Sequence, residues 1–474
     1  MPLYFYVFMI AFIADRRRSM ISTMKYDSII KNGYIVTENL IFTGSIGIKD
    51  GKIVTLMQQE DEDAEAAEIV DATGKYVMAG AVDAHVHLND PGRSHWEDWR
   101  CGTRAAAFGG TTCVADMPIN SIPALTNAAA FDEKLKQAEE KANIDYLFWG
   151  GLENDNLTEI AGMHEKGITG YKAFMSNSGV EFTTANDAIL LEGLKSTTDT
   201  DMFVGVHEEN DAVTAYYGKK MQEQGRCDAL SWVEARPAVQ ELEAVSRFLF
   251  WTEQTKGNGH LCHVSIPEAF DEIARAKSRG VSITAELCAH YLWFTLEDFL
   301  KQGPFLKCAP PIREASCKEA LWQKVMEEKV DMITSDHSPC SIEEKEKGKD
   351  NIWKAWGGVA GIQNVVHVLL TEGVNKRGLS LESVTRMVSA NPARRFGVYG
   401  KKGVIMPGAD ADIMIVDLDR KWIFKEEDIY TKSKISPYLG AEFTGKVIRT
   451  IVRGRTVFNE KIIPSDGYGE YVRS

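Results

Sequence analysis

The central part of the sequence repeats one pattern, in which apolar runs of strand length alternate with amphipathic segments. Eight such runs lie between residues 75 and 336: KYVMAGAVDAHVH, TTCVADM, DYLFWGGL, GITGYKAFM, MFVGVH, HLCHVS, SITAELC and VDMITSD. Near-continuous apolar strands that alternate with helices are typical of a parallel sheet covered by helices. Eight β/α units predict closure into a TIM-type (β/α)8 barrel. An open doubly wound sheet is the alternative, but the chain lacks the Gly-rich motifs GxGxxG and GxxxxGK[ST].

The two ends of the chain carry a different pattern, with short alternating apolar runs. Asn32-Gly33 and Asp50-Gly51 separate such runs near the N-terminus and predict hairpin turns. Similar runs return near the C-terminus in ADIMIVDL and KVIRTIVRGRTVFNEKII. Neither end has enough strands to bury a sheet alone, so we expect both ends to share one domain. The predicted division is a disordered extension at 1–23, a composite β-sandwich of 24–76 with 402–463, a barrel at 77–401 and a tail at 464–474.

Charge and cysteine content restrict the partners and the compartment. The formal net charge is -14, and an acidic surface repels the phosphates of nucleic acids. None of the eight cysteines forms a CxxC pair, which favours reduced thiols in a reducing compartment. We therefore expect a cytoplasmic protein without nucleic-acid or membrane partners.

An apolar segment at residues 3–13 is the one feature that points toward a membrane. It is shorter than the about 20 residues that a spanning helix needs. Its basic residues, Arg16 to Arg18, follow the apolar run, whereas those of a secretory signal precede it. A weak membrane-surface anchor is the alternative to a disordered extension.

Five of the eight runs carry residues that can bind a metal ion. They are His85 and His87 in the first run, Lys172 in the fourth, His207 in the fifth, His263 in the sixth and Asp336 in the eighth. The carboxyl ends of barrel strands surround one mouth, so these side chains are expected to converge. Alternate residues of a strand share a face, so His85 and His87 can share one ion. Neutral imidazole is a common ligand for zinc and related ions.

Three of the candidates leave alternatives open. Beside a metal-activated water, Asp336 can take the proton of the nucleophile and pass it to the leaving nitrogen. A protonated amine cannot bind a metal, so Lys172 is either a salt-bridge lysine or a neutral amine that takes up carbon dioxide as a carbamate. His260 lies close to His263 in the same run and remains ambiguous between ligand and core residue.

At these residues the chain resembles the cyclic amidohydrolases, a family that includes allantoinases, hydantoinases or dihydropyrimidinases, and dihydroorotases. The resemblance extends from about Met24 to Ile463 and is strongest toward the bacterial allantoinases. The matching stretches are DAHVHLNDPGRSHWEDWRCGTRAAAFGGTT, DMPINSIPALT, GYKAFMSNSGVEF, CHVSIPEAF, LKCAPPIRE, SDHSPC and IWKAWGGVAGIQ.

The resemblance implies a binuclear metal centre in a homotetrameric enzyme. Its ligands would be His85, His87, Lys172 as bridging N6-carboxylysine, His207, His263 and Asp336. Carbon dioxide would supply the carboxyl group on Lys172. Zinc is the expected metal, with cobalt, manganese and iron as alternatives. The implied reaction opens the hydantoin ring of (S)-allantoin to allantoate in purine catabolism.

The position two residues after His87 separates members of this family. Dihydroorotases that resemble this chain carry an arginine two positions after the second histidine, where this chain has Asn89. A neutral amide suits a substrate without a carboxylate, and a polar ureido arm needs hydrogen-bond partners. The candidate substrate contacts are Asn89, Arg93, Ser176, Asn177 and His337. Hydantoinase or dihydropyrimidinase activity is the alternative, and a non-enzymatic assembly protein of the same fold is a more distant one.

Overall fold

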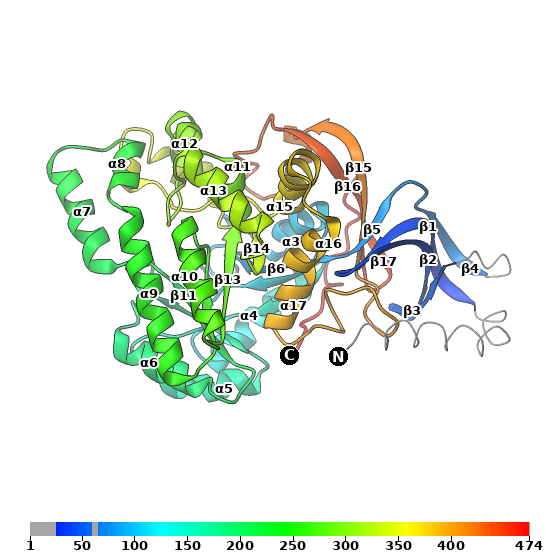
Figure 1. The fold of residues 1–474 in the computed structure, drawn as a ribbon, viewed down its shortest axis with the longest axis horizontal. Coiled ribbons are helices and arrows are strands. Elements are labelled where there is room, and N and C mark those ends of the chain that lie inside the picture. Colours follow the sequence, from blue (N-terminus) through cyan, green and yellow to red (C-terminus); the bar gives the residue numbers. More distant parts are fainter. Residues whose placement is uncertain (1–24, 59–64, 474) are drawn as a thin grey trace.

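The computed structural model describes residues 25–58 and 65–473, which form a β-rich part and a mixed α/β part (Figure 1). The predicted extension at residues 1–23 lies outside the described residues. No helix within the described ranges is long and apolar enough to cross a bilayer.

Both ends of the chain contribute to the β-rich part. Among the described residues, eight strands form one sheet in the order β17-β16-β15-β5-β1-β2-β3, with β4 paired to β1. The central pairing joins β5 to β15 in antiparallel register, with Val77 opposite Ile415. The bounds are β1 (Tyr26–Val36), β2 (Ile41–Lys49), β3 (Lys52–Met57), β4 (Ala66–Asp71), β5 (Tyr76–Ala79), β15 (Ile413–Ile423), β16 (Glu442–Val452) and β17 (Arg455–Asn459).

One of the two predicted hairpins is correct and the other is wrong. Asp50 and Gly51 have φ of 50° and 73° and connect β2 to β3, as expected for a tight hairpin. Asn32 has φ of 61° but lies inside β1, where the register with β2 shifts between Ile30 and Gly33. The left-handed residue there produces a bulge, because the chain continues in the same direction beside its partner strand.

The α/β part contains a strand in every one of the eight predicted runs. All pairings there are parallel, in two sheets ordered β6-β7-β8 and β14-β13-β12-β11-β10-β9. The two sheets adjoin at β8 and β9, which are separated by Trp149 alone. They also adjoin at their other ends, where an isolated parallel bridge joins Val86 of β6 to His337, three residues beyond β14. The bounds are β6 (Ala81–Val86), β7 (Thr111–Asp116), β8 (Asp145–Phe148), β9 (Gly150–Gly151), β10 (Gly170–Phe174), β11 (Phe203–His207), β12 (Gly259–Leu261), β13 (Ile283–Cys288) and β14 (Met332–Thr334).

The first predicted run is divided between the two parts of the molecule. Its first half forms β5 of the β-rich part, and its second half forms β6. Gly80 lies between them, where a Cβ atom would come 2.2 Å from Cγ2 of Thr112. A side chain at this position would therefore clash with Thr112 and force one of the two residues to shift.

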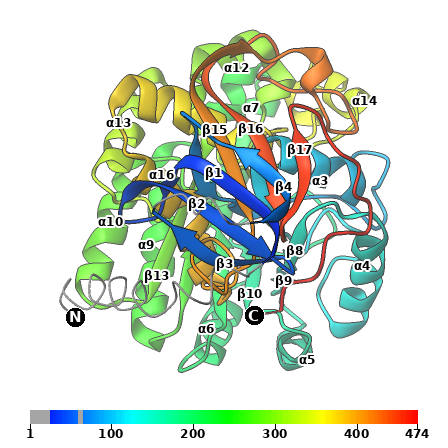
Figure 2. The same cartoon turned by 90° about the vertical axis from the view of Figure 1, so that its right-hand side faces the viewer.

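Helices lie around the parallel strands, and the β-rich part covers one side of the α/β part (Figure 2). Several helices begin at a polar residue whose side chain accepts a backbone N–H, among them Asp98, Asn127, Asn186, Asn210 and Asp228. The α-helices are α3 (Trp99–Phe108), α4 (Ala128–Lys141), α5 (Ile160–Glu165), α6 (Asp187–Ser196), α7 (Asp211–Glu223), α8 (Ala229–Glu234), α9 (Ala238–Thr255), α10 (Pro267–Ser278), α11 (Ala289–Trp293), α12 (Leu296–Gln302), α13 (Ala315–Met326), α14 (Ile342–Glu346), α15 (Val365–Val368), α16 (Leu381–Thr385) and α17 (Asn391–Arg395). Leu369–Asn375 and Arg386–Ala390 are π-helical, and short 3-10 turns span Leu157–Glu159, Gly303–Leu306, Ile352–Lys354 and Glu426–Asp428.

The C-terminal segment packs against the α/β part. Tyr471 forms a parallel bridge with Tyr146 of β8, and Val472 is buried. The backbone N–H of Ser465 donates to Oδ1 of Asn143 at 2.7 Å. The described residues after 463 are therefore held by both apolar and polar contacts.

Candidate metal centre

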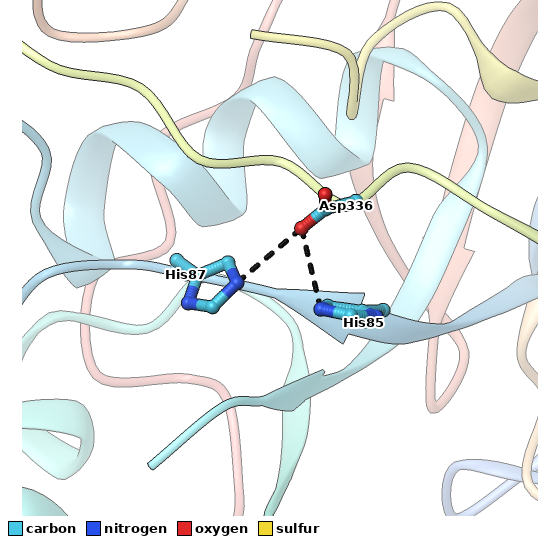
Figure 3. A group of neighbouring side chains, drawn as sticks. All are labelled: His85, His87 and Asp336. Atoms are coloured by element: carbon cyan, nitrogen blue, oxygen red, sulfur yellow. Dashed lines mark ion pairs between the residues drawn. The ribbon is translucent and has the colours of Figure 1, made fainter. Parts of the chain in front are cut away.

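Three of the predicted ligands meet at the ends of β6 and β14. His85 and His87 lie on either side of position 86 at the end of β6, and Asp336 lies two residues beyond β14. Oδ1 of Asp336 is 3.2 Å from Nε2 of His85 and 3.3 Å from Nε2 of His87 (Figure 3). All three side chains are buried. Two imidazole nitrogens and one carboxylate oxygen therefore converge closely enough to hold a single ion.

A second pair of histidines lies beside this group. His207 ends β11, and His263 lies two residues beyond β12. Nδ1 of His207 is 3.0 Å from Nε2 of His263. The rings of His85 and His263 are 5.4 Å apart between centroids, so the two groups adjoin.

Two of these residues have an uncommon backbone conformation. His263 has φ of 34° and Asp336 has φ of 41°, both in the left-handed region that favours glycine. Such conformations cost energy and persist where the surrounding structure imposes them, often at functional sites. The backbone N–H of His263 is held by Oε1 of Glu286 at 3.1 Å.

Lys172 lies in the middle of β10 and is 1% exposed. Its Nζ has no hydrogen-bond partner among the described residues. Burial lowers the pKa of Lys172. The nearby Cys262, Glu286 and Glu208 raise it by more than burial lowers it, so the pKa lies above its ordinary value. The neighbours that raise the pKa of this amine are thus Cys262 and two glutamates.

Neighbouring charge favours the ionised form of Asp336, whereas burial lowers the pKa of His85 and of His263. Burial raises the pKa of Asp336, but His85 and His87 lower it to about 2. Burial, reinforced by Lys172, holds the pKa of His263 well below its ordinary value. An ionised carboxylate and a neutral imidazole are the forms that bind metal ions.

Asn89 lies two residues after His87 and has one hydrogen-bond acceptor that no described residue uses. Its Nδ2 donates to the carbonyl of Pro339 at 2.9 Å, and φ is 61°. Its Oδ1 is buried and has no partner among the described residues. Asn89 can therefore accept a hydrogen bond from a ligand without breaking an existing contact.

The other candidate substrate contacts are differently placed. Arg93 donates to the carbonyl of Asn120 at 3.1 Å and to Glu181 at 2.7 Å. His337 is 0% exposed, and its Nε2 lies 3.6 Å from Oε2 of Glu97. Arg93 and His337 thus face carboxylates of the protein itself.

Ser176 and Asn177 follow β10 and line a cavity of about 640 Å³. Residues of α7 form another wall, together with Trp232, Arg236 and Trp353. Ser176 is buried and Asn177 is exposed. These two residues therefore face a space large enough for a small molecule.

Comparison with known proteins decides the family. Residues 76–457 match the model of the amidohydrolase family. The chain belongs to the amidohydrolase family. An allantoinase of Rubrobacter xylanophilus is 40% identical over 449 residues, which cover 94% of this chain and 98% of that protein. An allantoinase of Bacillus licheniformis is 38% identical over 459 residues, covering 95% of this chain and 100% of the relative.

Solved structures of similar amidohydrolases extend the comparison to the fold. The L-hydantoinase (dihydropyrimidinase) from Arthrobacter aurescens has a TM-score of 0.92 at 33% identity, with 95% of this chain and 100% of that chain covered. The dihydropyrimidinase from Brevibacillus agri has a TM-score of 0.88 at 29% identity, with 94% and 98% covered. The family resemblance inferred from the motifs is confirmed.

Amidohydrolases generally use a binuclear metal centre, and the residues of this chain fit one. Histidine nitrogens and an aspartate oxygen converge in two adjoining groups. Nζ of Lys172 is buried beside them without a hydrogen-bond partner among the described residues. Buried polar atoms without partners are costly, so this amidohydrolase has atoms in place that bound groups would satisfy.

Three buried glutamates next to the histidines were not among the predicted site residues. Glu286 contacts His85, Glu209 contacts His207, and Glu208 lies near His263. Burial alone would raise the pKa of Glu286, but His85 and His260 hold it well below its ordinary value. A sequence signal existed, because Glu208 and Glu209 directly follow His207 and Glu286 interrupts the apolar run SITAELC.

Proposed function

We propose that this chain hydrolyses the hydantoin ring of (S)-allantoin to allantoate, in purine catabolism. The observation that carries the proposal is the nearly full-length similarity to allantoinases in a chain that has a competent residue at all six expected ligand positions. Asn89, with its free Oδ1, also suits a substrate that offers N–H donors and no carboxylate.

Two divalent ions, with zinc as the expected metal, would be held by the two groups of ligands. His85, His87 and Asp336 suit one ion, and His207 and His263 suit the other. Lys172, carboxylated by carbon dioxide, would contribute oxygens to both. When bound, the ions lower the pKa of a water molecule and polarise the amide carbonyl.

Asp336 is the proposed proton carrier. Its pKa of about 2 keeps the carboxylate ionised at neutral pH, so it can accept the proton that the attacking water loses. The new bond forms at the carbonyl carbon, and the ring C–N bond breaks. Asp336 then returns the proton to the leaving nitrogen, which becomes a ureido nitrogen, and the carbonyl becomes the carboxylate of the product.

Asn89 is the proposed recognition residue for the ureido arm. Its Oδ1 is buried and can accept one N–H of the arm, while its Nδ2 stays on the carbonyl of Pro339. The contact to Pro339 fixes the amide orientation, so the acceptor is aligned before the substrate arrives.

A substrate panel tests the activity. The purified protein, supplemented with zinc, manganese or cobalt, is assayed with allantoin, hydantoin, dihydrouracil and dihydroorotate, and its metal content is measured on the same preparation. We expect the highest kcat/KM for allantoin and about two ions per chain. Faster turnover of dihydrouracil than of allantoin would support the second candidate, a dihydropyrimidinase, which the TM-score of 0.92 to a hydantoinase favours. A protein without metal and without activity would support the assembly-protein alternative.

The complete architecture is part of the same proposal. We infer that the parallel strands of residues 77–401 close into a (β/α)8 barrel, which the Val86–His337 bridge supports. Residues 24–76 and 402–463 would form the composite β-sandwich, with 464–474 as the C-terminal segment. The proposed enzyme is a cytoplasmic homotetramer.

A further inference from the structure

We propose that Glu286, Glu209 and Glu208 are positioning residues that fix which ring nitrogen of His85, His207 and His263 faces the metal ions. The inference rests on the proposed metal centre, whose ligand histidines these three glutamates contact. None of the three glutamates is itself assigned as a ligand.

Glu286 fixes His85. Its side chain is fully buried on β13, and Oε1 contacts Nδ1 of His85. An ionised carboxylate only accepts hydrogen bonds, so Nδ1 of His85 carries the proton and Nε2 keeps its lone pair. That Nε2 is the atom 3.2 Å from Oδ1 of Asp336, on the side where the ion would be held.

Glu286 also holds the second group of ligands. The same Oε1 accepts the backbone N–H of His263 at 3.1 Å, where the chain has its left-handed conformation. Its Oε2 lies 3.4 Å from Nε2 of His260, whose Nδ1 is 2.8 Å from Oγ1 of Thr284. His260, left ambiguous by the sequence, is thus a contact of the glutamate.

Glu209 gives His207 the opposite tautomer. Its Oε2 lies 2.9 Å from Nε2 of His207, so that nitrogen carries the proton and Nδ1 is free. Nδ1 is the atom that faces His263 at 3.0 Å. Nε2 of Gln240 donates to Oε1 of Glu209 at 2.9 Å, so the carboxylate is held in place independently of the histidine.

Glu208 faces His263 across a short gap. Both of its carboxylate oxygens are buried and lack hydrogen-bond partners among the described residues, as does Nδ1 of His263. Oε1 of Glu208 is 3.7 Å from that Nδ1. A metal ion on Nε2 of His263 would make the Nδ1 proton a better donor, and Glu208 is the acceptor in position to receive it.

Glutamine variants test the three contacts, and Glu241 supplies a matched control. Glutamine keeps the size of the side chain and removes its charge. Glu241 is equally buried, but it accepts hydrogen bonds from Ser265 and Arg313 and contacts none of the proposed ligands.

The variants E286Q, E209Q, E208Q and E241Q are purified as full-length protein and loaded with cobalt(II). Metal affinity is measured by competition with a chelator, the visible spectrum reports coordination, and thermal unfolding of the metal-free forms reports the fold.

The expected result is a fall in cobalt affinity of about 10- to 100-fold in the three site variants, with an altered visible spectrum. E286Q should weaken the binding of both ions, because Glu286 contacts His85 and the backbone of His263. E209Q and E208Q should first lose the ion of His207 and His263. E241Q should change the unfolding temperature without changing cobalt affinity. Wild-type affinity and spectrum in all three site variants would overturn the inference, as would an equal loss of affinity in E241Q. Because no reading uses allantoin, failure of the proposed substrate would leave this test unaffected.

Discussion

Several of the buried polar atoms without partners lie around the candidate metal centre. Nζ of Lys172, Nδ1 of His87, Oδ1 of Asn89 and the carboxylate of Glu208 all lack partners among the described residues. An unpaired buried polar group costs about 1–3 kcal/mol, and more when it is charged. The concentration of such groups at the strand ends is the residue-level mark of a site that binds other chemical groups.

Lys172 provides the sharpest test of the metal centre. Lys172→Ala removes the proposed bridging group, and activity should fall by about 10²-fold or more. Acetate or propionate should restore part of it by supplying a carboxylate in the same space, as measured by allantoin turnover at rising acid concentration. Lys134→Ala, at an equally buried lysine bound to Asp116, is the control that short acids should not rescue. Full activity of Lys172→Ala without added acid would exclude the bridging role.

Asn89 is the residue that we propose to recognise the ureido arm of the substrate. Asn89→Gly removes the free Oδ1 and tolerates the left-handed φ of 61°. The kcat/KM for allantoin should fall by about 10-fold, because one buried hydrogen bond to the ureido arm is lost. Hydantoin has no ureido arm, so its turnover is the internal control. An equal loss for both substrates would show that Asn89 acts on the fold of the loop and not on recognition.

At the scale of elements, contacts between segments distant in the sequence join short elements to the rest of the molecule. The segment after residue 463 packs on β8, and α15 is joined to β16 through His367. Nδ1 of His367 donates to the carbonyl of Gln363 at 2.9 Å, and its Nε2 accepts from the N–H of Val447 at 3.3 Å. Such contacts decide the stability of elements whose own sequences are short.

The C-terminal segment should contribute measurably to stability. The Tyr471 ring lies 5.3 Å from the rings of both Phe131 and Phe148, between centroids. Tyr471→Ala should lower the free energy of unfolding by about 2–3 kcal/mol, since a large half-buried ring is lost. Tyr471→Phe is the matched control, because the hydroxyl has no partner among the described residues. Denaturant unfolding measures both, and an unchanged Tyr471→Ala would contradict the packing.

His367 should make stability depend on pH. Burial lowers its pKa to about 3, whereas an unfolded histidine titrates near about 6.5. Between these values the unfolded chain binds more protons, so this stabilisation is complete above pH of about 6.5 and is lost as the pH falls. The free energy of unfolding of the wild type should therefore decline between about pH 6.5 and 4.5. His367→Gln should reduce the slope of this decline by about 1 kcal/mol per pH unit. Parallel slopes for wild type and His367→Gln would refute the assignment.

For the whole molecule, a buried charge cluster joins the two parts. Lys402 is 1% exposed, and its Nζ contacts Asp145 of β8 in the α/β part. The same Nζ lies 2.8 Å from carboxylates of Asp410 and Asp412, which precede β15 of the β-rich part. One cation thus balances carboxylates that come from both parts of the molecule.

Removal of that cation should destabilise the molecule strongly. Lys402→Met leaves the carboxylates of Asp145, Asp410 and Asp412 buried with less compensation, which typically costs about 3–5 kcal/mol. Lys52→Met is the control, because Lys52 also contacts Asp410 but its side chain is 43% exposed, and the cost should stay below about 1 kcal/mol. Calorimetry measures the thermal unfolding of both variants. Similar unfolding midpoints for Lys402→Met and Lys52→Met would contradict the role of the buried cluster.

The sequence by itself determined the parallel strands and the candidate ligands. Its eight apolar runs each contain a strand, and His85, His87, His207 and Asp336 lie at or just beyond strand ends as predicted. These features are local, since an apolar run and its terminal residue record which face a strand presents and where it stops.

Only the tertiary structure decided which side chains meet. Glu286 is 201 residues from His85, and Lys402 is 257 residues from Asp145, so no local pattern contains either pair. Asn32-Gly33 has the composition of a hairpin turn, yet it forms a bulge because β2 continues beside both halves of β1. Local sequence sets the secondary structure that a segment prefers. The segment that it packs against depends on the folding of the whole chain, and the contacts of each charged side chain depend on that packing.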